Sequence, residues 1–254
     1  MTHDLQLPTG KKLFFASDCH LGEPDYLTSR EREKKMVSWL DHFQDQAAGF
    51  FLLGDIFDFW FEYNHVVPKG YVRFLGKLAE ITDRGIPIFF FTGNHDMWLF
   101  DYFSQELNIS VFREPQSFTV KNATLQVGHG DGLGPGQVSY KMLKVIFSNR
   151  FSQWLFKWIH PNLGFPLANL WSRNSRNQNG VAQPFTSADD EKIYQYCQDT
   201  EHKNHHDFYV YGHRHLTLEL PINHRSVYVN VGEWIQGYTY GVYDGTDFKL
   251  ETFD

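Results

Sequence analysis

The sequence predicts an α/β fold in which two β-sheets pack as a sandwich, helices flank the sandwich and a helical insertion interrupts it. Short apolar segments alternate with helical patterns in the first half, more strand-like segments follow in the second half, and a basic, aromatic segment separates the two. The 254 residues are 42% hydrophobic and 21% charged, which excludes a largely disordered chain. We expect a core of residues 1–132 and 189–254, with residues 133–188 forming the insertion, called the insert below.

Apolar runs bounded by polar residues predict the strands. In the first half they alternate with helices, an order that predicts parallel strands joined by right-handed crossovers. Ligands bind such sheets at the carboxyl ends of the strands. The predicted strands are residues 13–17, 49–53 and 86–92 in the first half and 118–120, 124–128, 208–211, 227–231, 238–243 and 249–253 in the second.

Two helices are expected between the first three strands. Thr28 and Glu31 have the spacing of a capping box, which places the start of a helix that runs to about Gln46. The second helix covers residues 71–84 and ends at Gly85. Both helices therefore connect parallel strands.

Cysteine content and hydropathy indicate the cellular compartment. Cys19 and Cys197 are the only cysteines and lie far apart, so a disulfide framework is not expected. Residues 1–12 include Asp4 and lack the apolar centre of a signal peptide. No run of eighteen apolar residues occurs anywhere. We expect a cytoplasmic protein that does not span a membrane.

The insert has an unusual charge. It contains six basic residues, no acidic residue and nine aromatic residues, although the whole chain carries a net charge of −7. This composition suits an anionic lipid surface, a phosphate-bearing amphiphile or a nucleic acid. The alternative is a pair of helices that pack their aromatic side chains on the core.

Polar clusters follow the first two strands. Asp18 and His20 are two positions apart, which places both side chains on one side of an extended segment, although such a pair is also common in turns. Gly54 allows a tight turn that leaves Asp55 projecting from the sheet edge. Asp58 either supports such a site or is an exposed turn residue.

Further clusters follow three later strands. Asn94, His95 and Asp96 come after the third strand; Asn94 or Asp96 could cap a helix, but capping gives His95 no role. His129 follows another strand, and the His213-x-His215 pair can address one metal from an extended backbone. All five clusters offer metal-type donors at strand ends, which makes coincidence a poor explanation.

The collected donors are oxygen and imidazole atoms without a thiolate. This set favours Mn, Fe or Zn over Mg or Ca. Seven ligands are too many for one such ion, so we expect two divalent ions that share a carboxylate, and such pairs hydrolyse phosphoesters. The predicted ligands are Asp18, His20, Asp55, Asn94, His129, His213 and His215.

The ordered series Asp18-x-His20, Gly54-Asp55-x-x-Asp58, Gly93-Asn94-His95-Asp96, Gly128-His129 and Gly212-His213-x-His215 resembles the calcineurin-like metallophosphoesterases. The resemblance implies a two-sheet metallophosphoesterase sandwich and two metal ions bridged by Asp55. It assigns Asp18, His20 and His215 to one ion and Asn94, His129 and His213 to the other. It also implies that His95 lies beside the scissile phosphate as electrostatic stabiliser or proton donor, oriented by Asp96.

The sequence of the insert indicates one family among these metallophosphoesterases. Its segments 132–136, 140–141, 153–156, 160–161 and 171–176 resemble the UDP-2,3-diacylglucosamine diphosphatases of lipid A biosynthesis. That family implies a helical lid that holds the acyl chains, and a diphosphate cleavage that yields UMP and 2,3-diacylglucosamine 1-phosphate.

We expect a peripheral position on the inner membrane, because the insert offers apolar Trp and Phe side chains among Lys and Arg residues. We expect no nucleic-acid partner, since the chain is acidic overall, and no protein partner is implied. His95 stands where the best-known branch of that family has arginine. The side chains expected to contact the substrate are Tyr140, Lys144, Arg173 and Arg176.

Two other functions remain open at this stage. A dimetal phosphodiesterase or nuclease would use the basic insert to grip nucleic acid, with affinity that falls steeply as salt rises. A non-catalytic scaffold that has lost its metals is the second, but every ligand position is filled here.

Overall fold

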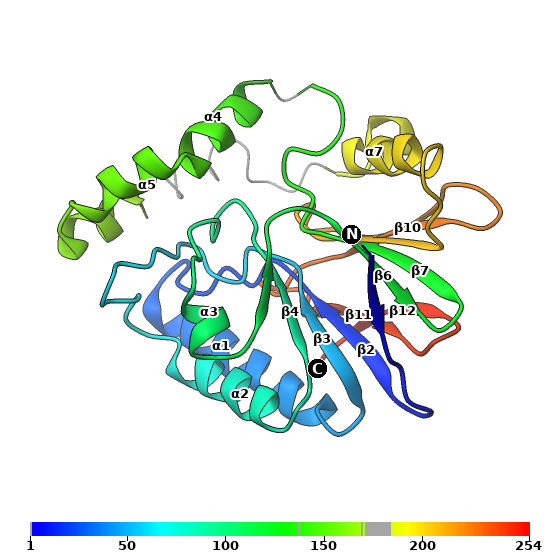
Figure 1. Ribbon diagram of the computed structural model, residues 1–254, viewed down its shortest axis with the longest axis horizontal. Coiled ribbons are helices and arrows are strands. Elements are labelled where there is room, and N and C mark those ends of the chain that lie inside the picture. The colour runs from blue at the N-terminus through cyan, green and yellow to red at the C-terminus, as the bar shows by residue number, and fades with distance from the viewer. Residues whose placement is uncertain (1, 137, 169, 171–183) are drawn as a thin grey trace.

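The computed structural model describes residues 2–136, 138–168, 170 and 184–254 and contains two six-stranded sheets that pack as a sandwich (Figure 1). The two-sheet fold class predicted from the sequence is confirmed. The first sheet has the order β12-β11-β2-β3-β4-β5, and its strands β2 to β5 run parallel. Its strands are β2 (Lys12–Ala16), β3 (Ala47–Leu52), β4 (Ile88–Phe91), β5 (Ser110–Phe112), β11 (Thr239–Tyr243) and β12 (Phe248–Thr252).

The second sheet has the order β1-β6-β7-β8-β10-β9. Strands β7 and β8 are parallel, as are β8 and β10, whereas β6 and β7 form an antiparallel pair. The N-terminal strand, which the sequence did not predict, pairs in parallel with β6 at the sheet edge. The strands are β1 (Thr2–Leu5), β6 (Gln116–Val120), β7 (Ala123–Val127), β8 (Phe208–Tyr211), β9 (Thr217–Pro221) and β10 (Val227–Val231).

Alternating side chains along the strands build three apolar layers. On β2, Leu13 and Phe15 point into the space between the sheets, where they pack with Val127 and Val210 of the second sheet. The intervening Phe14 points the other way, toward the helices. The core between the sheets therefore fixes both sheets in one orientation, with the ends of β2 and β8 at the same edge.

Helices cover the outer faces of the sandwich. Buried residues of α1 (Tyr26–Phe43) and α2 (Val72–Asp83) pack on the first sheet, with the short α3 (Tyr102–Gln105) beside them. Helix α7 (Lys192–Glu201), preceded by the 3₁₀ turn Ala188–Asp190, covers the second sheet. The layers are therefore helix, sheet, sheet and helix.

Helix α1 begins earlier than the capping-box pattern indicates. The N-cap is Asp25, whose carboxylate accepts hydrogen bonds from the backbone N–H groups of Leu27 and Thr28. The Thr28–Glu31 box was therefore wrong. Asp25 is the N-cap because an aspartate in extended conformation satisfies two otherwise unpaired N–H groups of the first turn.

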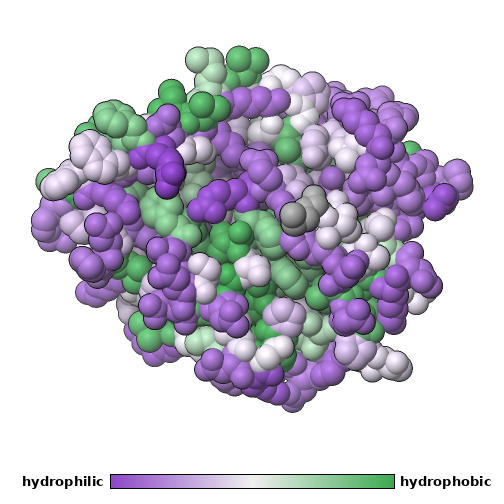
Figure 2. Space-filling view, viewed as in Figure 1, coloured by the Kyte–Doolittle hydropathy of each residue, from purple (hydrophilic) through white to green (hydrophobic). Residues whose placement is uncertain are grey.

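The described part of the insert contains α4 (Val138–Ser148), α5 (Arg150–Lys157) and helical residues 161–168. Figure 1 shows α4 and α5 as an arm above the sandwich. Figure 2 shows hydrophobic side chains on the upper rim, over this arm. Exposed apolar residues of α4 and α5 are Val138, Met142, Val145, Ile146, Phe151, Trp154 and Leu155.

Aromatic side chains of the core hold the arm in place. The ring of Phe156 lies 4.6 Å from that of Phe61 and 4.9 Å from that of Trp98, measured between centroids. Trp98 Nε1 also donates a hydrogen bond to the carbonyl oxygen of Phe147, at 2.8 Å. Part of the aromatic content of the insert is thus used for packing on the core. Within the described residues, no helix combines the length and the apolarity needed to cross a bilayer.

Candidate metal centre

Five loops meet at one edge of the sandwich. Three of them follow β2, β3 and β4 of the first sheet, and two follow β7 and β8 of the second. Parallel strands carry their carboxyl ends to the same edge, which is why residues up to 197 positions apart in sequence become neighbours. Three groups of possible metal ligands form there: Asp18, His20 and His215; His20, Asp55 and His95; and Asp55, His129 and His213.

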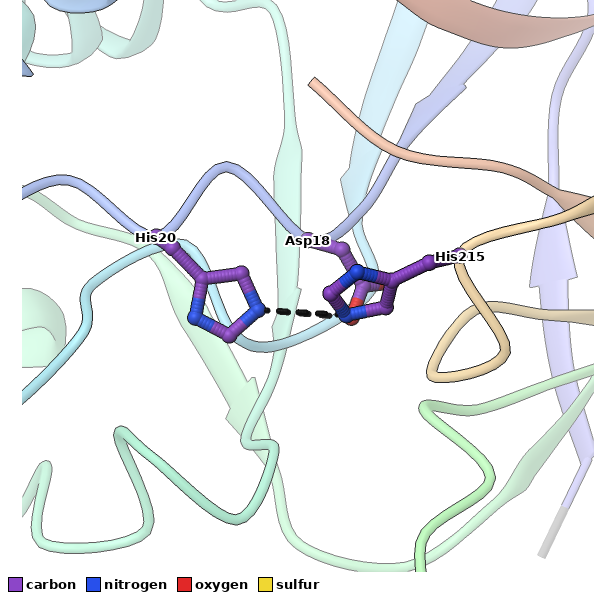
Figure 3. Close-up of side chains that lie close together, drawn as sticks. All are labelled: Asp18, His20 and His215. Atoms are coloured by element: carbon purple, nitrogen blue, oxygen red, sulfur yellow. Dashed lines mark hydrogen bonds and ion pairs between the residues drawn. The ribbon is translucent and has the colours of Figure 1, made fainter. Parts of the chain in front are cut away.

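The first group surrounds a point between two imidazoles (Figure 3). His20 Nε2 and His215 Nε2 face each other at 3.3 Å. Asp18 Oδ1 lies 3.1 Å from His215 Nε2 and 3.9 Å from His20 Nε2. Three donor atoms that converge in this way have the geometry of a cation site.

Asp55 belongs to both of the other groups. Its Oδ2 lies 3.4 Å from His129 Nε2 and 3.9 Å from His20 Nε2, so it faces ligands from either side. Its other oxygen accepts a hydrogen bond from the backbone N–H of His95 at 2.9 Å, which fixes the carboxylate plane. Asp55 therefore lies between His20 and His129.

Several buried oxygen and nitrogen atoms of the predicted ligands have no hydrogen-bond partner, as expected of residues that bind metal ions. Among the residues that the structure describes, Asp18 Oδ1, Asn94 Oδ1 and His129 Nε2 are buried without a hydrogen bond. Buried polar atoms are nearly always satisfied, so a cluster of unsatisfied ones needs a ligand. His129 Nδ1 lies 2.6 Å from the carbonyl oxygen of Leu53, a contact that keeps its proton there and leaves Nε2 for a metal. The residues therefore fit divalent ions.

The predicted ligands adopt an unusual backbone conformation. Asp18, His20, Asp55, His213 and His215 all have φ between 43° and 69°, in the left-handed region. The extended geometry expected for the two Asp/His-x-His pairs was therefore wrong. Such residues cost about 1–3 kcal/mol each and persist where the surroundings impose them, typically at functional sites.

Arg32 holds the first of these loops and was not identified from the sequence. Its guanidinium is buried, and Nη1 donates to the carbonyl oxygens of Cys19, His20 and Glu23 at 2.9, 3.0 and 3.1 Å. The only available signal was a basic residue on the inner face of α1. Arg32 thereby stabilises the left-handed turn that presents His20.

Burial and charge act against each other at the centre. Burial raises the pKa of Asp18, but His215 more than offsets it and the pKa falls to about 2. Burial also raises the pKa of Asp55, yet His129 and His95 bring it well below its usual value. Conversely, burial lowers the pKa of His129, but Asp55 raises it to about 10. The carboxylates thus favour positive charge at this point, which divalent ions supply without protons.

The side chain beside the His95 imidazole is Asp58. His95 Nδ1 lies 3.0 Å from the Asp58 carbonyl oxygen and 3.6 Å from its carboxylate, which also lies 3.5 Å from His20 Nδ1. Asp58 is buried, so it is a supporting residue rather than an exposed turn residue.

Asp96, expected to orient His95, binds the backbone of two loops. Its carboxylate accepts hydrogen bonds from the N–H groups of Gly93 at 2.7 Å and Ile56 at 2.9 Å. Burial, followed by repulsion from Asp55, raises the pKa of Asp96 to about 7. Asp58 therefore contacts the His95 ring directly, and Asp96 joins the loops after β3 and β4.

Two of the four predicted substrate contacts lie near the centre. Tyr140 donates to Asp131 Oδ2 at 2.7 Å, and Lys144 Nζ contacts the same oxygen at 2.9 Å. Asp131 follows His129 by two residues, so these contacts join α4 to a ligand-bearing loop. Arg173 and Arg176 lie outside the described residues.

Comparison with known proteins agrees with this geometry. The model of the calcineurin-like phosphoesterase family matches residues 11–216, which include all seven predicted ligands. The chain belongs to the calcineurin-like phosphoesterase family. Members of this family are metal-dependent hydrolases, so the protein is a hydrolase, and the family implies divalent metal ions at the cluster described above.

Relatives of this phosphoesterase cover almost its whole length. It is 33% identical to the UDP-2,3-diacylglucosamine hydrolase of Porphyromonas gingivalis, over 96% of this chain and 98% of the relative. It is 23% identical to the protein of the same name from Actinobacillus succinogenes, over 88% and 92% of the two chains. Among solved structures, the E. coli phosphoesterase Yfce aligns with a TM-score of 0.46 and 16% identity, covering 96% of this chain and 93% of that chain.

Proposed function

We propose that this phosphoesterase hydrolyses the diphosphate of UDP-2,3-diacylglucosamine to UMP and 2,3-diacylglucosamine 1-phosphate. The observation that carries the proposal is the group of buried, unsatisfied metal-donor atoms at the edge shared by the two sheets. A relative that matches over nearly its whole length is a UDP-2,3-diacylglucosamine hydrolase. A reaction of this kind belongs to the lipid A pathway.

The residues around the centre have distinct roles in this proposal. One divalent ion would be held by Asp18, His20 and His215 and the other by Asn94, His129 and His213, with Asp55 shared. Oxygen and imidazole ligands suit Mn, Fe or Zn, of which we propose Mn²⁺. When bound, two such ions polarise phosphoryl oxygens and lower the pKa of water. His95 stabilises charge on the phosphate or donates a proton, and Asp58 holds its ring.

The insert takes the lipid part of the substrate. Residues 133–188 form a lid in this proposal, joined to the ligand-bearing loop through Asp131, Tyr140 and Lys144. Exposed apolar side chains of α4 and α5, together with Trp158 directly after α5, supply a surface for acyl chains and for the inner membrane. Because Lys and Arg residues lie among them, anionic lipid is favoured.

The assay of the purified protein with synthetic UDP-2,3-diacylglucosamine and Mn²⁺ tests the reaction. We expect equimolar UMP and acylated glucosamine 1-phosphate by mass spectrometry, and loss of both after treatment with a chelator. No cleavage of this lipid, together with hydrolysis of nucleic acid or simple phosphodiesters, would favour the phosphodiesterase alternative.

Flotation with vesicles tests the membrane part separately. We expect the protein to float with vesicles that contain anionic phospholipid, and the paired change Trp154→Ser and Trp158→Ser to reduce the floating fraction. The matched control is the paired change Tyr26→Ser and Leu27→Ser, which removes two exposed apolar side chains on α1, outside the arm. Unchanged flotation of the double variant would place the membrane contact elsewhere.

A further inference from the structure

A cavity of about 170 Å³ opens beside the candidate metal centre. Its lining includes Asp58 and Phe59 of the loop that follows β3 and Phe165 of the insert. The cavity joins the metal centre through Asp58, whose carboxylate lies 3.5 Å from Nδ1 of His20. A ligand group in this cavity would therefore lie next to a phosphate at the metal centre.

Gly22 and Tyr71 pack closely against each other in the wall of the cavity. Tyr71 donates its hydroxyl to the carbonyl oxygen of Leu21 at 3.1 Å, and a Cβ on Gly22 would lie 2.7 Å from that hydroxyl oxygen. Only glycine permits this close approach, and Gly22 has φ of +112°. The hydroxyl of Tyr71 is thus committed to the wall and is not a free donor to a ligand.

Two aromatic side chains and one lysine in the lining of the cavity suit a planar ring. The rings of Phe59 and Phe165 lie 5.3 Å apart between centroids at 79°, which gives the cavity an aromatic face. Lys69 also lines it and is exposed. Among the residues that the structure describes, no carboxylate or carbonyl oxygen pairs with its ammonium group. The cavity therefore offers stacking surface and one available cationic donor.

We propose that this cavity binds the uracil base of the substrate, with Lys69 donating to a pyrimidine carbonyl oxygen and an aromatic ring stacking on the base. The inference rests on the proposed function, which supplies a uridine nucleotide. Pockets for whole drug-sized ligands measure roughly 300–1,000 Å³, so this cavity takes one ring-sized part of the substrate. The charged side chains of Asp58 and Lys69 line the cavity and disfavour an acyl chain, because hydrocarbon packed against them would remove water from charged groups.

Isothermal titration calorimetry of the Mn²⁺-loaded full chain tests the proposal with UMP, ribose 5-phosphate and inorganic phosphate. Because ribose 5-phosphate lacks only the base, we expect UMP to bind roughly tenfold tighter than it does. Lys69→Met should weaken UMP by about five- to tenfold and leave ribose 5-phosphate unchanged, since the lost hydrogen bond is to the base. Phe165→Leu should reduce the preference for UMP. The charge-matched control is Lys203→Met, an exposed lysine after α7.

Three results would overturn the inference. Equal affinity of the wild type for UMP and ribose 5-phosphate would show that no base site exists. An equal loss of all three ligands in Lys69→Met would make Lys69 a general electrostatic group, and an equal loss of UMP and ribose 5-phosphate with inorganic phosphate unchanged would assign the cavity to the sugar. These measurements do not use turnover, so UMP-specific binding without cleavage of the lipid would contradict the proposed reaction alone.

Discussion

The carbonyl oxygen of Asp58 lies 3.0 Å from Nδ1 of His95, although the two residues belong to loops that follow different strands. The carboxylate of Asp58 lies within 3.6 Å of the same nitrogen and within 3.5 Å of His20 Nδ1. Asp58 therefore fixes the ring orientation of a predicted metal ligand and of the predicted catalytic histidine at once.

We expect Asp58→Asn to lower activity by about 10- to 100-fold, the usual effect of changing a residue that orients a metal-bound histidine. The amide keeps the volume but removes the charge that favours a proton on Nδ1 of both imidazoles. Steady-state kinetics and metal content by mass spectrometry measure the effect. Full activity with full metal content would show that the carboxylate does not support these rings.

Asp55→Asn should be the most damaging ligand change, because both predicted metal positions share this carboxylate. We expect both ions to be lost and activity to disappear. The metal-to-protein ratio after dialysis is the measurement, with circular dichroism to confirm folding. Loss of a single ion with near-normal turnover would contradict the bridging assignment.

His95→Ala should separate catalysis from metal binding. If His95 acts on the phosphate, the variant keeps both ions and slows hydrolysis by roughly 10² to 10⁴, the usual contribution of a positioned proton-transfer group. His95→Arg is an informative companion, since arginine can supply the charge but not the proton. A fall in metal content that parallels the fall in rate would make His95 a ligand instead.

The position of the candidate centre followed from the sequence because parallel strands bring their carboxyl ends to one edge. Leu13, Phe15 and their counterparts on neighbouring strands are apolar enough to predict those strands, and the polar residues after each strand then had to meet. That argument uses only the order of the strands, so it does not depend on loop conformation.

Loop conformation could not be predicted by the same route. The left-handed backbone of Asp18 and His20 depends on the distant Arg32, which binds the carbonyl oxygens of the turn. No local pattern records such a contact. Strand β1 was missed for a related reason, because its partner β6 begins more than a hundred residues later. In addition, β1 contains no run of apolar residues that would predict a strand.

Stability should depend on pH through Glu201, at the end of α7. Its carboxylate accepts hydrogen bonds from Tyr209 at 2.8 Å and Ser226 at 2.9 Å, and lies 2.7 Å from His205 Nδ1. Burial raises its pKa, but these partners more than offset it and the pKa falls to about 2 from a usual value of 4.5. A carboxylate with a depressed folded-state pKa stabilises the protein above the unfolded value and loses that contribution as pH falls from about 4.5 toward 2.

We therefore expect Glu201→Gln to lower the free energy of unfolding by about 1–3 kcal/mol at pH 7. The difference from the wild type should narrow as pH is lowered below 4.5. Urea unfolding at pH 7, 5 and 4 measures it, and Glu219→Gln on the exposed edge strand β9 is the control. A difference that stays constant between pH 5 and 4, or that grows, would exclude the charge of Glu201 as the cause.

The last prediction concerns which phosphorus is attacked. Cleavage of the diphosphate yields UMP and the lipid phosphate whichever phosphorus receives water, so product identity does not distinguish the two. The cavity proposed for uracil adjoins the metal centre through Asp58, which places the phosphorus that carries uridine nearest the predicted ligands. His95, on the same side, is then available to assist departure of the lipid phosphate. Turnover in ¹⁸O-labelled water should put the label in UMP, as read by mass spectrometry, and label in the sugar phosphate would reverse this orientation.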